Sequence, residues 1–328
     1  MTTTDQAYGT SRTDLSSLNA AMNIVRQEIG KVIVGQSAMI DLLLAAILAD
    51  GHVLIEGVPG VAKTLTAKLL ARCIDVPFSR IQFTPDLMPS DVLGTSVFNP
   101  QNATFQFRQG PIFSNIVLID EINRSPAKTQ AALFEVMEEK QVTFDGITYP
   151  MSKPFLVLAT QNPIEQEGTY RLPEAQLDRF LFKIEVNYPT MEEEVMILQH
   201  THEGKTTHFH EVVHKVLSAD EIETYRLQIS GLFIERKVME YIAQIIHETR
   251  NNKSLFLGAS PRASVAVLKT AKAFAAMRGR DFVTPDDVVM VVPPVLRHRI
   301  LLTPEKEMEG LKPDEIITGI LKKVEVPR

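Results

Sequence analysis

A glycine-rich turn directly behind a short apolar run constrains this chain more than any other feature. Residues 52–64 read HVLIEGVPGVAKT, a pattern that predicts a buried strand over 52–56 and a helix from Lys63. Gly57 and Gly60 let the turn bring backbone N–H groups close to an anion, and the following helix directs its positive end at the same point. The segment therefore predicts a phosphate-binding loop between a strand and a helix.

The residue types of this loop indicate the phosphates of a nucleotide together with Mg²⁺. Lys63 is placed to reach the β- and γ-phosphates, and the hydroxyl of Thr64 is a candidate Mg²⁺ ligand. Ala62 departs from the general G-x-x-x-x-G-K-[ST] pattern, which usually has Gly there. A plain strand-to-helix turn with a chance Lys-Thr pair is the alternative. We expect the nucleotide to contact Gly57, Val58, Pro59, Gly60, Val61, Ala62, Lys63, Thr64 and Leu65.

Two carboxylates at the end of a second apolar strand indicate metal binding and water activation. Residues 115–123, NIVLIDEIN, deliver Asp120 and Glu121 at the carboxyl end of the strand, where open α/β sheets bind ligands. We predict that Asp120 holds Mg²⁺, often through its water shell, and that Glu121 polarises the water attacking the γ-phosphate. A strand that ends in two solvated acids is the alternative, which the upstream loop makes less attractive.

A third predicted strand, FLVLATQNP at residues 155–163, ends in polar side chains. An amide offers a donor and an acceptor together, so Asn162 can hydrogen-bond both the attacking water and a γ-phosphate oxygen. An Asn that only forms the turn before Pro163 is the alternative. Asn162 is our candidate for sensing the γ-phosphate.

Composition limits the partners and the compartment. The chain has 328 residues, of which 45% are hydrophobic, and this favours about two domains with packed cores. A net charge of −6 does not suggest bulk nucleic-acid binding, although a local basic groove stays open. Cys73 is the only cysteine, so no intrachain disulfide can form. Because neither a signal peptide nor a membrane-spanning apolar run is present, we expect a cytoplasmic protein.

Strand and helix patterns alternate in the first half of the chain, and helix patterns dominate the second. The alternation predicts a parallel sheet with helices on both faces. Two insertions interrupt it, near residues 95–108 and 141–150, and each reads as a β-hairpin. We interpret their phenylalanines as hairpin packing rather than client contacts. The predicted units are a disordered N-terminus (1–14), a nucleotide-binding α/β domain (15–188) and a helical lid domain (189–328).

In the helical half, the sequence predicts the first residues of several helices and places one arginine near a helix N-terminus. Capping boxes are predicted at Ser218 and Thr284, and Ser260 is a predicted cap for a helix over residues 261–277. Arg262 lies in the first turn of that helix, where a cation opposes the macrodipole and calls for an external anion. A bound triphosphate would supply one. An exposed arginine tolerated at modest cost is the alternative.

The segment HEVVH, residues 210–214, matches the H-E-x-x-H zinc pattern, and three more histidines stand nearby. That pattern binds zinc on a helix, where positions i and i+4 share one face. The capping box at Ser218 places the next helix after the motif. In an extended segment His210 and His214 would lie about 13 Å apart, too far for one ion. We therefore interpret the cluster as solvated or partly packed histidines between helices.

Taken in this order, the motifs resemble those of AAA+ ATPases and, more narrowly, of the MoxR family. The resemblance covers about residues 20–325 and is carried by GVPGVAKT, VLIDEINRSPAKTQAALFEVMEE, ATQNP, EGTYRLPEAQLDRF and GASPRAS. This family usually has Ala where Ala62 stands, so the departure supports the resemblance. It implies a P-loop NTPase αβα sandwich with a parallel sheet, the AAA+ core, followed by a smaller all-helical lid.

The resemblance also implies roles for single residues. Asn162 matches the sensor-1 position, Arg179 of LDRF matches the arginine finger, and Arg262 matches sensor 2. Residues 32–36, VIVGQ, match the segment near the adenine. Val34 and Gly35 therefore join the expected ATP contacts.

Proteins of this family are generally thought to form hexameric rings that remodel partner proteins. The resemblance implies Mg-dependent hydrolysis of ATP to ADP and phosphate, with von Willebrand A domain proteins as partners on separate chains. We expect Arg262 to couple the γ-phosphate to lid rotation and Arg179 to reach the neighbouring subunit. The insertions match elements associated with the central pore.

Two other functions are the alternatives to a protein-remodelling ATPase. A DNA-remodelling motor would favour basic insertions, but residues 97–107 and 141–150 contain no Lys or Arg. A nucleotide-gated binding module with little turnover would not need the water-polarising Glu121. ATP is favoured over GTP because no Asn-Lys-x-Asp segment is present.

Overall fold

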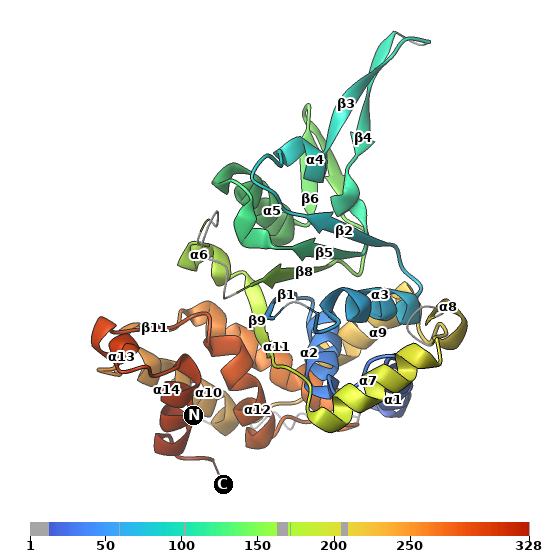
Figure 1. The fold of residues 1–328 in the computed structure, drawn as a ribbon. Coiled ribbons are helices and arrows are strands. Elements are labelled where there is room, and N and C mark those ends of the chain that lie inside the picture. Colours follow the sequence, from blue (N-terminus) through green and yellow to red (C-terminus); the bar gives the residue numbers. More distant parts are fainter. Residues whose placement is uncertain are drawn as a thin grey trace, which may run out of the picture.

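A five-stranded parallel sheet forms the centre of the molecule, in the strand order β2-β5-β8-β1-β9 (Figure 1). This computed structural model describes residues 13–58, 60–101, 103–162, 170, 172–204 and 209–327. Every pair of neighbouring strands is parallel, so all carboxyl ends meet at one edge. The strands are β1 (His52–Gly57), β2 (Phe78–Gln82), β5 (Ile116–Asp120), β8 (Leu156–Gln161) and β9 (Phe180–Val186).

Helices cover both faces of the sheet, because its central strands are apolar on both sides. In β1, Val53 and Ile55 pack into one hydrophobic cluster, while Leu54 packs into the other. The first cluster includes residues of α1 (Ser16–Gly30), α2 (Ser37–Leu48) and α3 (Lys63–Ile74). The second includes residues of α4 (Pro89–Leu93), the 3₁₀ turns Pro111–Phe113 and Ile122–Arg124, and α5 (Ala127–Glu139). The predicted αβα sandwich with a parallel sheet is confirmed.

Both insertions form the predicted antiparallel hairpins and project beyond the central sheet at the top of Figure 1. The first consists of β3 (Gly94–Asn99) and β4 (Thr104–Gln109), and the second of β6 (Gln141–Phe144) and β7 (Ile147–Pro150). Asp145 and Gly146 both have positive φ, as a two-residue hairpin turn of the I′ type requires. The Phe107 ring lies 4.9 Å from Phe144, so the two hairpins pack against each other.

In the described residues 189–204 and 209–327, the chain is helical apart from one small ribbon and an isolated bridge between Phe233 and Phe282. The predicted caps at Ser218, Ser260 and Thr284 are all present. The ribbon pairs β10 (Leu255–Leu257) with β11 (Leu301–Leu302), so the half is not purely helical as expected; strands this short carry no readable alternation. Its helices are α7 (Met191–His202), α8 (Phe209–Val212), α9 (Ala219–Ser230), α10 (Arg236–Arg250), α11 (Pro261–Met277), α12 (Pro285–Leu296), α13 (Pro304–Met308) and α14 (Pro313–Lys323).

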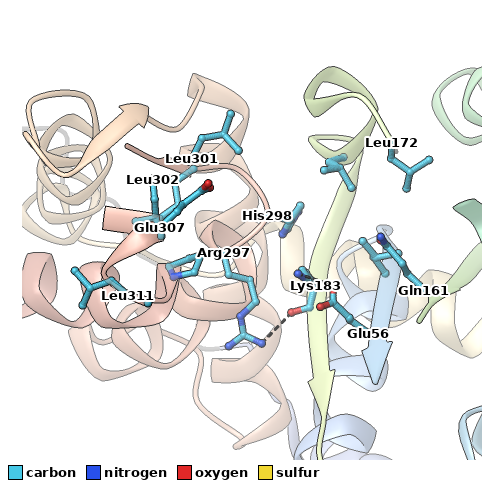
Figure 2. A pocket seen from close by; sticks show the side chains of 15 residues that line it. Glu56, Gln161, Leu172, Lys183, Arg297, His298, Leu301, Leu302, Glu307 and Leu311 are labelled. Carbon is cyan, nitrogen blue, oxygen red and sulfur yellow. Dashed lines mark hydrogen bonds and ion pairs between the residues drawn. The ribbon is translucent and has the colours of Figure 1, made fainter. Parts of the chain in front are cut away.

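Two arginines, of which Arg299 is buried, connect the helical half to the edge strand β9. Arg299 donates to the Asp178 carboxylate at 2.7 Å and to the Phe180 carbonyl at 2.6 Å. Arg297 donates to the Lys183 carbonyl at 3.2 Å, across one wall of a cavity of about 520 Å³ (Figure 2). Because Arg299 is buried, losing either acceptor would leave part of a charged group unsatisfied.

The helix that precedes β9 is a single short turn. α6 spans only Glu174–Leu177, because Phe180 already begins β9 and enters the sheet beside His52. The boundary after residue 188 stays a prediction, and most of the predicted disordered N-terminus lies outside the described residues. Among the described residues, no helix is both long and apolar enough to cross a membrane.

His52 gives the fold a dependence on pH. Its Nδ1 accepts from the Val157 N–H at 3.0 Å, and its Nε2 donates to the Met137 carbonyl at 3.1 Å. Burial lowers the pKa of His52 to about 4. An unfolded histidine takes up a proton below about pH 6.5, whereas the folded one stays neutral down to about pH 4. The stabilisation is therefore complete above pH 6.5 and is lost as the pH falls toward 4.

We expect the free energy of unfolding in urea to fall between pH 6.5 and 4, with His52 contributing up to about 1.4 kcal/mol per pH unit. His52→Gln should flatten this slope in part, because the buried His298, whose pKa is also lowered by burial, keeps its share. His210→Gln, at an exposed histidine, is the matched control. Identical slopes for wild type and His52→Gln would contradict the assignment.

Candidate active site

The predicted phosphate loop connects the carboxyl end of β1 to the start of α3. Gly60 and Ala62 both have positive φ, at 87° and 57°, which turns the backbone sharply before Lys63. Ala62 bears this left-handed conformation although Gly would adopt it at lower cost. A Cβ on Gly57 would lie 2.7 Å from the Val186 carbonyl oxygen, so only glycine fits beside β9. Pro59, one of the predicted contacts, lies outside the described residues.

Lys63 lies among the predicted catalytic carboxylates. Its ammonium donates to the Gly57 carbonyl at 2.7 Å, across the loop. Burial lowers the pKa of Lys63, while the charges of Asp120, Glu121 and Glu56 act in the opposite direction. The structure thus brings together Lys63, Asp120 and Glu121, which are far apart in the sequence.

Asp120 is buried at the end of β5 and is held on both carboxylate oxygens. Thr160 donates its hydroxyl to Oδ1 at 3.1 Å, and Arg80 of β2 donates to Oδ2 at 2.5 Å. Thr64 is the second residue of α3, directly after Lys63, so its hydroxyl lies in the first turn of that helix. Hydroxyl and carboxylate oxygens are the ligands that Mg²⁺ prefers, so Thr64 and Asp120 fit the predicted metal site.

Glu121 adopts a left-handed backbone conformation with φ of 58°, which turns its side chain away from the strand direction. Its N–H donates to the Thr160 hydroxyl at 3.0 Å. Its carboxylate pairs with Arg124 at 2.8 Å. A non-glycine residue in this conformation costs free energy that the surrounding contacts must offset, a feature common at functional sites.

Asn162 follows directly after β8, and β8 lies between β5 and β1 in the sheet. Gln161 pairs with Glu56 in register, so Asn162 extends from the same edge as the phosphate loop. It is half-buried. The predicted sensor-1 residue thus lies at the edge that carries Lys63 and Glu121.

A cavity of about 530 Å³ lies next to the phosphate loop. Val186 forms part of its wall and also contacts Gly57, so the cavity begins where the loop begins. Gly35, predicted to lie near the adenine, lines it with φ of 74°, and Val34 is half-buried just before. The apolar part of the wall comes from Met39, Leu42, Ile184, Phe274, Met290 and Pro293. Such a lining suits a flat heterocyclic base.

The two predicted arginines lie elsewhere. Arg179 donates to the Phe134 carbonyl at 2.6 Å, and its Nε lies 3.6 Å from a Glu138 oxygen. Arg262, exposed at the start of α11, lies 3.5 Å from the other oxygen of Glu138. Both arginines therefore gather around one carboxylate at the end of α5.

That carboxylate is at the opposite edge of the sheet from the phosphate loop. Met137, its neighbour in sequence, accepts from His52 at the amino end of β1, and Arg179 directly precedes the strand residue paired with His52. β1 rises about 3.3 Å per residue, so its two ends are roughly 17 Å apart. The structure does not bring Arg179 or Arg262 to the Lys63 of the same chain.

The HEVVH segment is helical only in part. α8 ends at Val212, before His214, so the two histidines do not share one continuous helix. The His214 N–H donates to Glu28 at 3.0 Å, and Arg72 binds the carbonyls of His210 and Val213. Within the part of the chain that the structure describes, no group of three or more His, Cys, Asp and Glu side chains is arranged to hold a metal ion.

Sequence reasoning missed Thr160, Arg80 and Arg124 as parts of the site. Thr160 lies inside the recognised motif ATQNP and could have been found from its place beside Asn162. Arg80 had no such signal, because its position opposite Asp120 depends on the pairing of β2 with β5.

Comparison with known proteins agrees with this geometry. A model of the ATPase family associated with various cellular activities (AAA) matches residues 52–182, and a model of the AAA lid domain matches residues 247–320. Chaperone MoxR1 of Mycobacterium tuberculosis is 44% identical over 92% of this chain and 81% of its own length. The chain belongs to the MoxR family of AAA+ ATPases.

Two further relatives extend this family assignment. YeaC of Bacillus subtilis is 46% identical to this MoxR-family chain over 92% of it and 93% of YeaC. A Cytophaga hutchinsonii protein of known crystal structure superimposes with a TM-score of 0.88 at 44% identity. That likeness covers 95% of this chain and 97% of the other, so the sheet and the helical lid are both shared.

We expect Thr160→Val to lower the free energy of unfolding of the nucleotide-free protein by about 1–3 kcal/mol, because the Glu121 N–H and an Asp120 oxygen both lose their partner. Thr160→Ser keeps the hydroxyl and is the control. Urea unfolding measures both. A Val variant as stable as the Ser variant would show that the hydroxyl does not connect the two carboxylates.

Proposed function

We propose that this protein hydrolyses ATP to ADP and phosphate with Mg²⁺ as cofactor. The observation that carries the proposal is the meeting of Lys63, Thr64, Asp120 and Glu121 at one edge of the sheet, beside a cavity sized for a base. Membership of an ATPase family supports it.

In the proposed site, some residues bind the nucleotide and the metal ion, and others activate the attacking water. Lys63 and the backbone N–H groups of the loop bind the phosphates, and the cavity beside Gly35 takes the adenine. Thr64 and Asp120 would hold Mg²⁺, which neutralises charge on the phosphates when bound. Glu121 accepts a proton from the attacking water, and Asn162 orients that water against the γ-phosphate.

Arg179 and Arg262 complete the site from a neighbouring chain in this proposal. At roughly 17 Å from the phosphate-loop edge, neither reaches the phosphates of its own chain without a large rearrangement. Both lie at one exposed edge around Glu138. This favours a trans role for Arg262 as well, in place of the lid coupling within one chain that the sequence suggested. A ring, hexameric as the family resemblance implies, supplies such a neighbour to every site.

The biological role that we propose is remodelling or assembly of partner proteins. A relative is named a chaperone, and the hairpins β3–β4 and β6–β7 extend from the body where a partner can be reached (Figure 1). Partners bearing von Willebrand A domains, on separate chains, are our proposal from the family resemblance. DNA remodelling is less favoured, because the hairpin tips carry no basic residues.

We expect Lys63→Ala to abolish binding of ATP, because the ammonium is the only side-chain cation that the loop offers the phosphates. Glu121→Gln should bind ATP with Mg²⁺ but hydrolyse it about 10²–10⁴ times more slowly, since the amide cannot accept the proton. Lys68→Ala, an exposed lysine on the same helix, is the control. Calorimetry and phosphate release measure the two effects. If Lys63→Ala binds ATP with the affinity of the wild type, the assignment of residues 57–65 as a phosphate-binding loop is wrong.

A mixing experiment tests the trans arginines. Arg179→Ala should bind ATP and lose about 10³–10⁵ in rate, and Arg262→Ala should also lose activity. Mixing either variant with Glu121→Gln should restore part of the ATPase, because some interfaces then join an intact Glu121 to an intact arginine. Mixed assemblies that form but stay inactive would assign the arginine to its own chain.

A further inference from the structure

The carboxylate of Asp178 connects the two chain segments that carry the arginines of the proposed reaction. Asp178 directly precedes Arg179 in the sequence. Its Oδ2 accepts from the Ser260 hydroxyl at 3.0 Å, and Ser260 is the N-cap of α11. The same hydroxyl oxygen accepts from the Arg262 N–H at 3.2 Å. One side chain, that of Ser260, therefore links Asp178 to the backbone of Arg262.

A buried arginine holds Asp178 from the other side. Arg299, whose side chain is 3% exposed, donates from Nε to Asp178 Oδ1 at 2.7 Å. Its Nη2 donates to the Asp178 carbonyl at 3.1 Å and to the Phe180 carbonyl at 2.6 Å. These two residues flank Arg179 in the chain. The backbone that carries Arg179 is therefore held on both sides by one guanidinium group.

The segment that leads into α11 is also held in place. The Ala259 N–H donates to the Thr249 hydroxyl at 3.0 Å, and Arg250 donates to the Ala259 carbonyl at 2.9 Å. A Cβ on Gly258 would lie 2.7 Å from the Thr249 carbonyl oxygen, so only glycine fits there. Because Ala259 is bonded to the last turn of α10 through both of its backbone polar groups, Ser260 follows a fixed backbone.

The contacts of the two arginines with Glu138 are weaker than this link. Glu138 oxygens lie 3.6 Å from Arg179 Nε and 3.5 Å from Arg262 Nη2, and the Glu138 side chain is 42% exposed. Exposed ion pairs of this kind contribute little to stability. The Asp178 side chain is only 18% exposed, and its partner Arg299 is buried. When the arginines exchange Glu138 for a phosphate, the Asp178 link can therefore persist.

We propose that Asp178 is a positioning residue, which keeps Arg179 and the first turn of α11 with Arg262 in one fixed arrangement. Its effect on catalysis rests on the proposed function, since the arrangement matters only if both arginines act on the phosphates. Asp178 itself contacts neither the nucleotide nor Mg²⁺ in this proposal. It acts on Arg262 through Ser260 and on Arg179 through the chain.

The test breaks the link at Ser260, because removing the Asp178 carboxylate would leave the buried Arg299 without its counter-charge and destabilise the fold. Ser260→Ala should lower kcat for ATP hydrolysis about 10–100-fold, since small displacements of a catalytic group cost rate on this scale. The Kd of a non-hydrolysable ATP analogue, measured by calorimetry, should stay at the wild-type value. Ser260→Thr keeps the hydroxyl and should restore most of kcat.

Ser218→Ala is the matched control. Ser218 caps α9 with the same type of hydrogen bond, from the Glu221 N–H at 3.3 Å, and its hydroxyl donates to the Glu221 carboxylate of the same helix. Ser218→Ala and Ser260→Ala each remove one helix cap, so both should lower the melting temperature by similar amounts. Only Ser260→Ala should lower kcat, which separates positioning from loss of stability.

A second background shows whether Ser260 acts through Arg262. In an Arg262→Ala chain, Ser260→Ala should have no further effect on kcat, whereas general damage to the fold would lower the rate again. An active wild type overturns the proposal if Ser260→Ala keeps the wild-type kcat, if Ser218→Ala loses as much, or if the double variant loses more than Arg262→Ala. A wild type that hydrolyses no ATP overturns the proposed function as well, so the two failures are distinguishable.

Discussion

The hydroxyl of Thr160 connects the two carboxylates on which the candidate site depends. It donates to Asp120 and accepts from the backbone of Glu121, so one side chain on β8 sets the end of β5. This connection is available because β8 lies beside β5 in a parallel sheet, where all carboxyl ends meet at one edge. Because both strands are buried on both faces, a slip of one residue would move every side chain into the opposite core and disrupt the packing of both.

Each charged group of the site already has a partner inside the chain. Lys63 binds the Gly57 carbonyl, Asp120 is paired with Arg80, and Glu121 with Arg124. These contacts hold the groups in place and limit the cost of burying charge. In the proposed reaction, phosphates and Mg²⁺ would therefore replace existing partners of these groups. Arg80 and Arg124 would then compete with Mg²⁺ and the attacking water for Asp120 and Glu121.

Short-range sequence patterns predict the turns and strand ends of this region, but not the contacts between side chains on different strands. The loop, the acidic strand end and the hairpin turn at Asp145-Gly146 follow from short-range rules, because glycine φ angles and strand ends depend on neighbouring residues. Helix ends and short strands were less certain: α6 stops where Phe180 enters the sheet, and the β10–β11 ribbon carried no pattern. Arg80 needed the strand pairing itself, which no local spacing records.

The position of Arg179 and Arg262 has a consequence for assembly. In the proposed reaction, a chain that carries its phosphate loop at one edge of the sheet and both arginines at the other has an incomplete catalytic set at each edge. A two-fold dimer that joins like edges would place loop against loop or arginine against arginine. A head-to-tail contact sets an arginine edge against a loop edge at every interface of a ring. In the proposed ring, therefore, the same asymmetry that leaves one chain unable to complete its site makes hydrolysis in each chain depend on its neighbour.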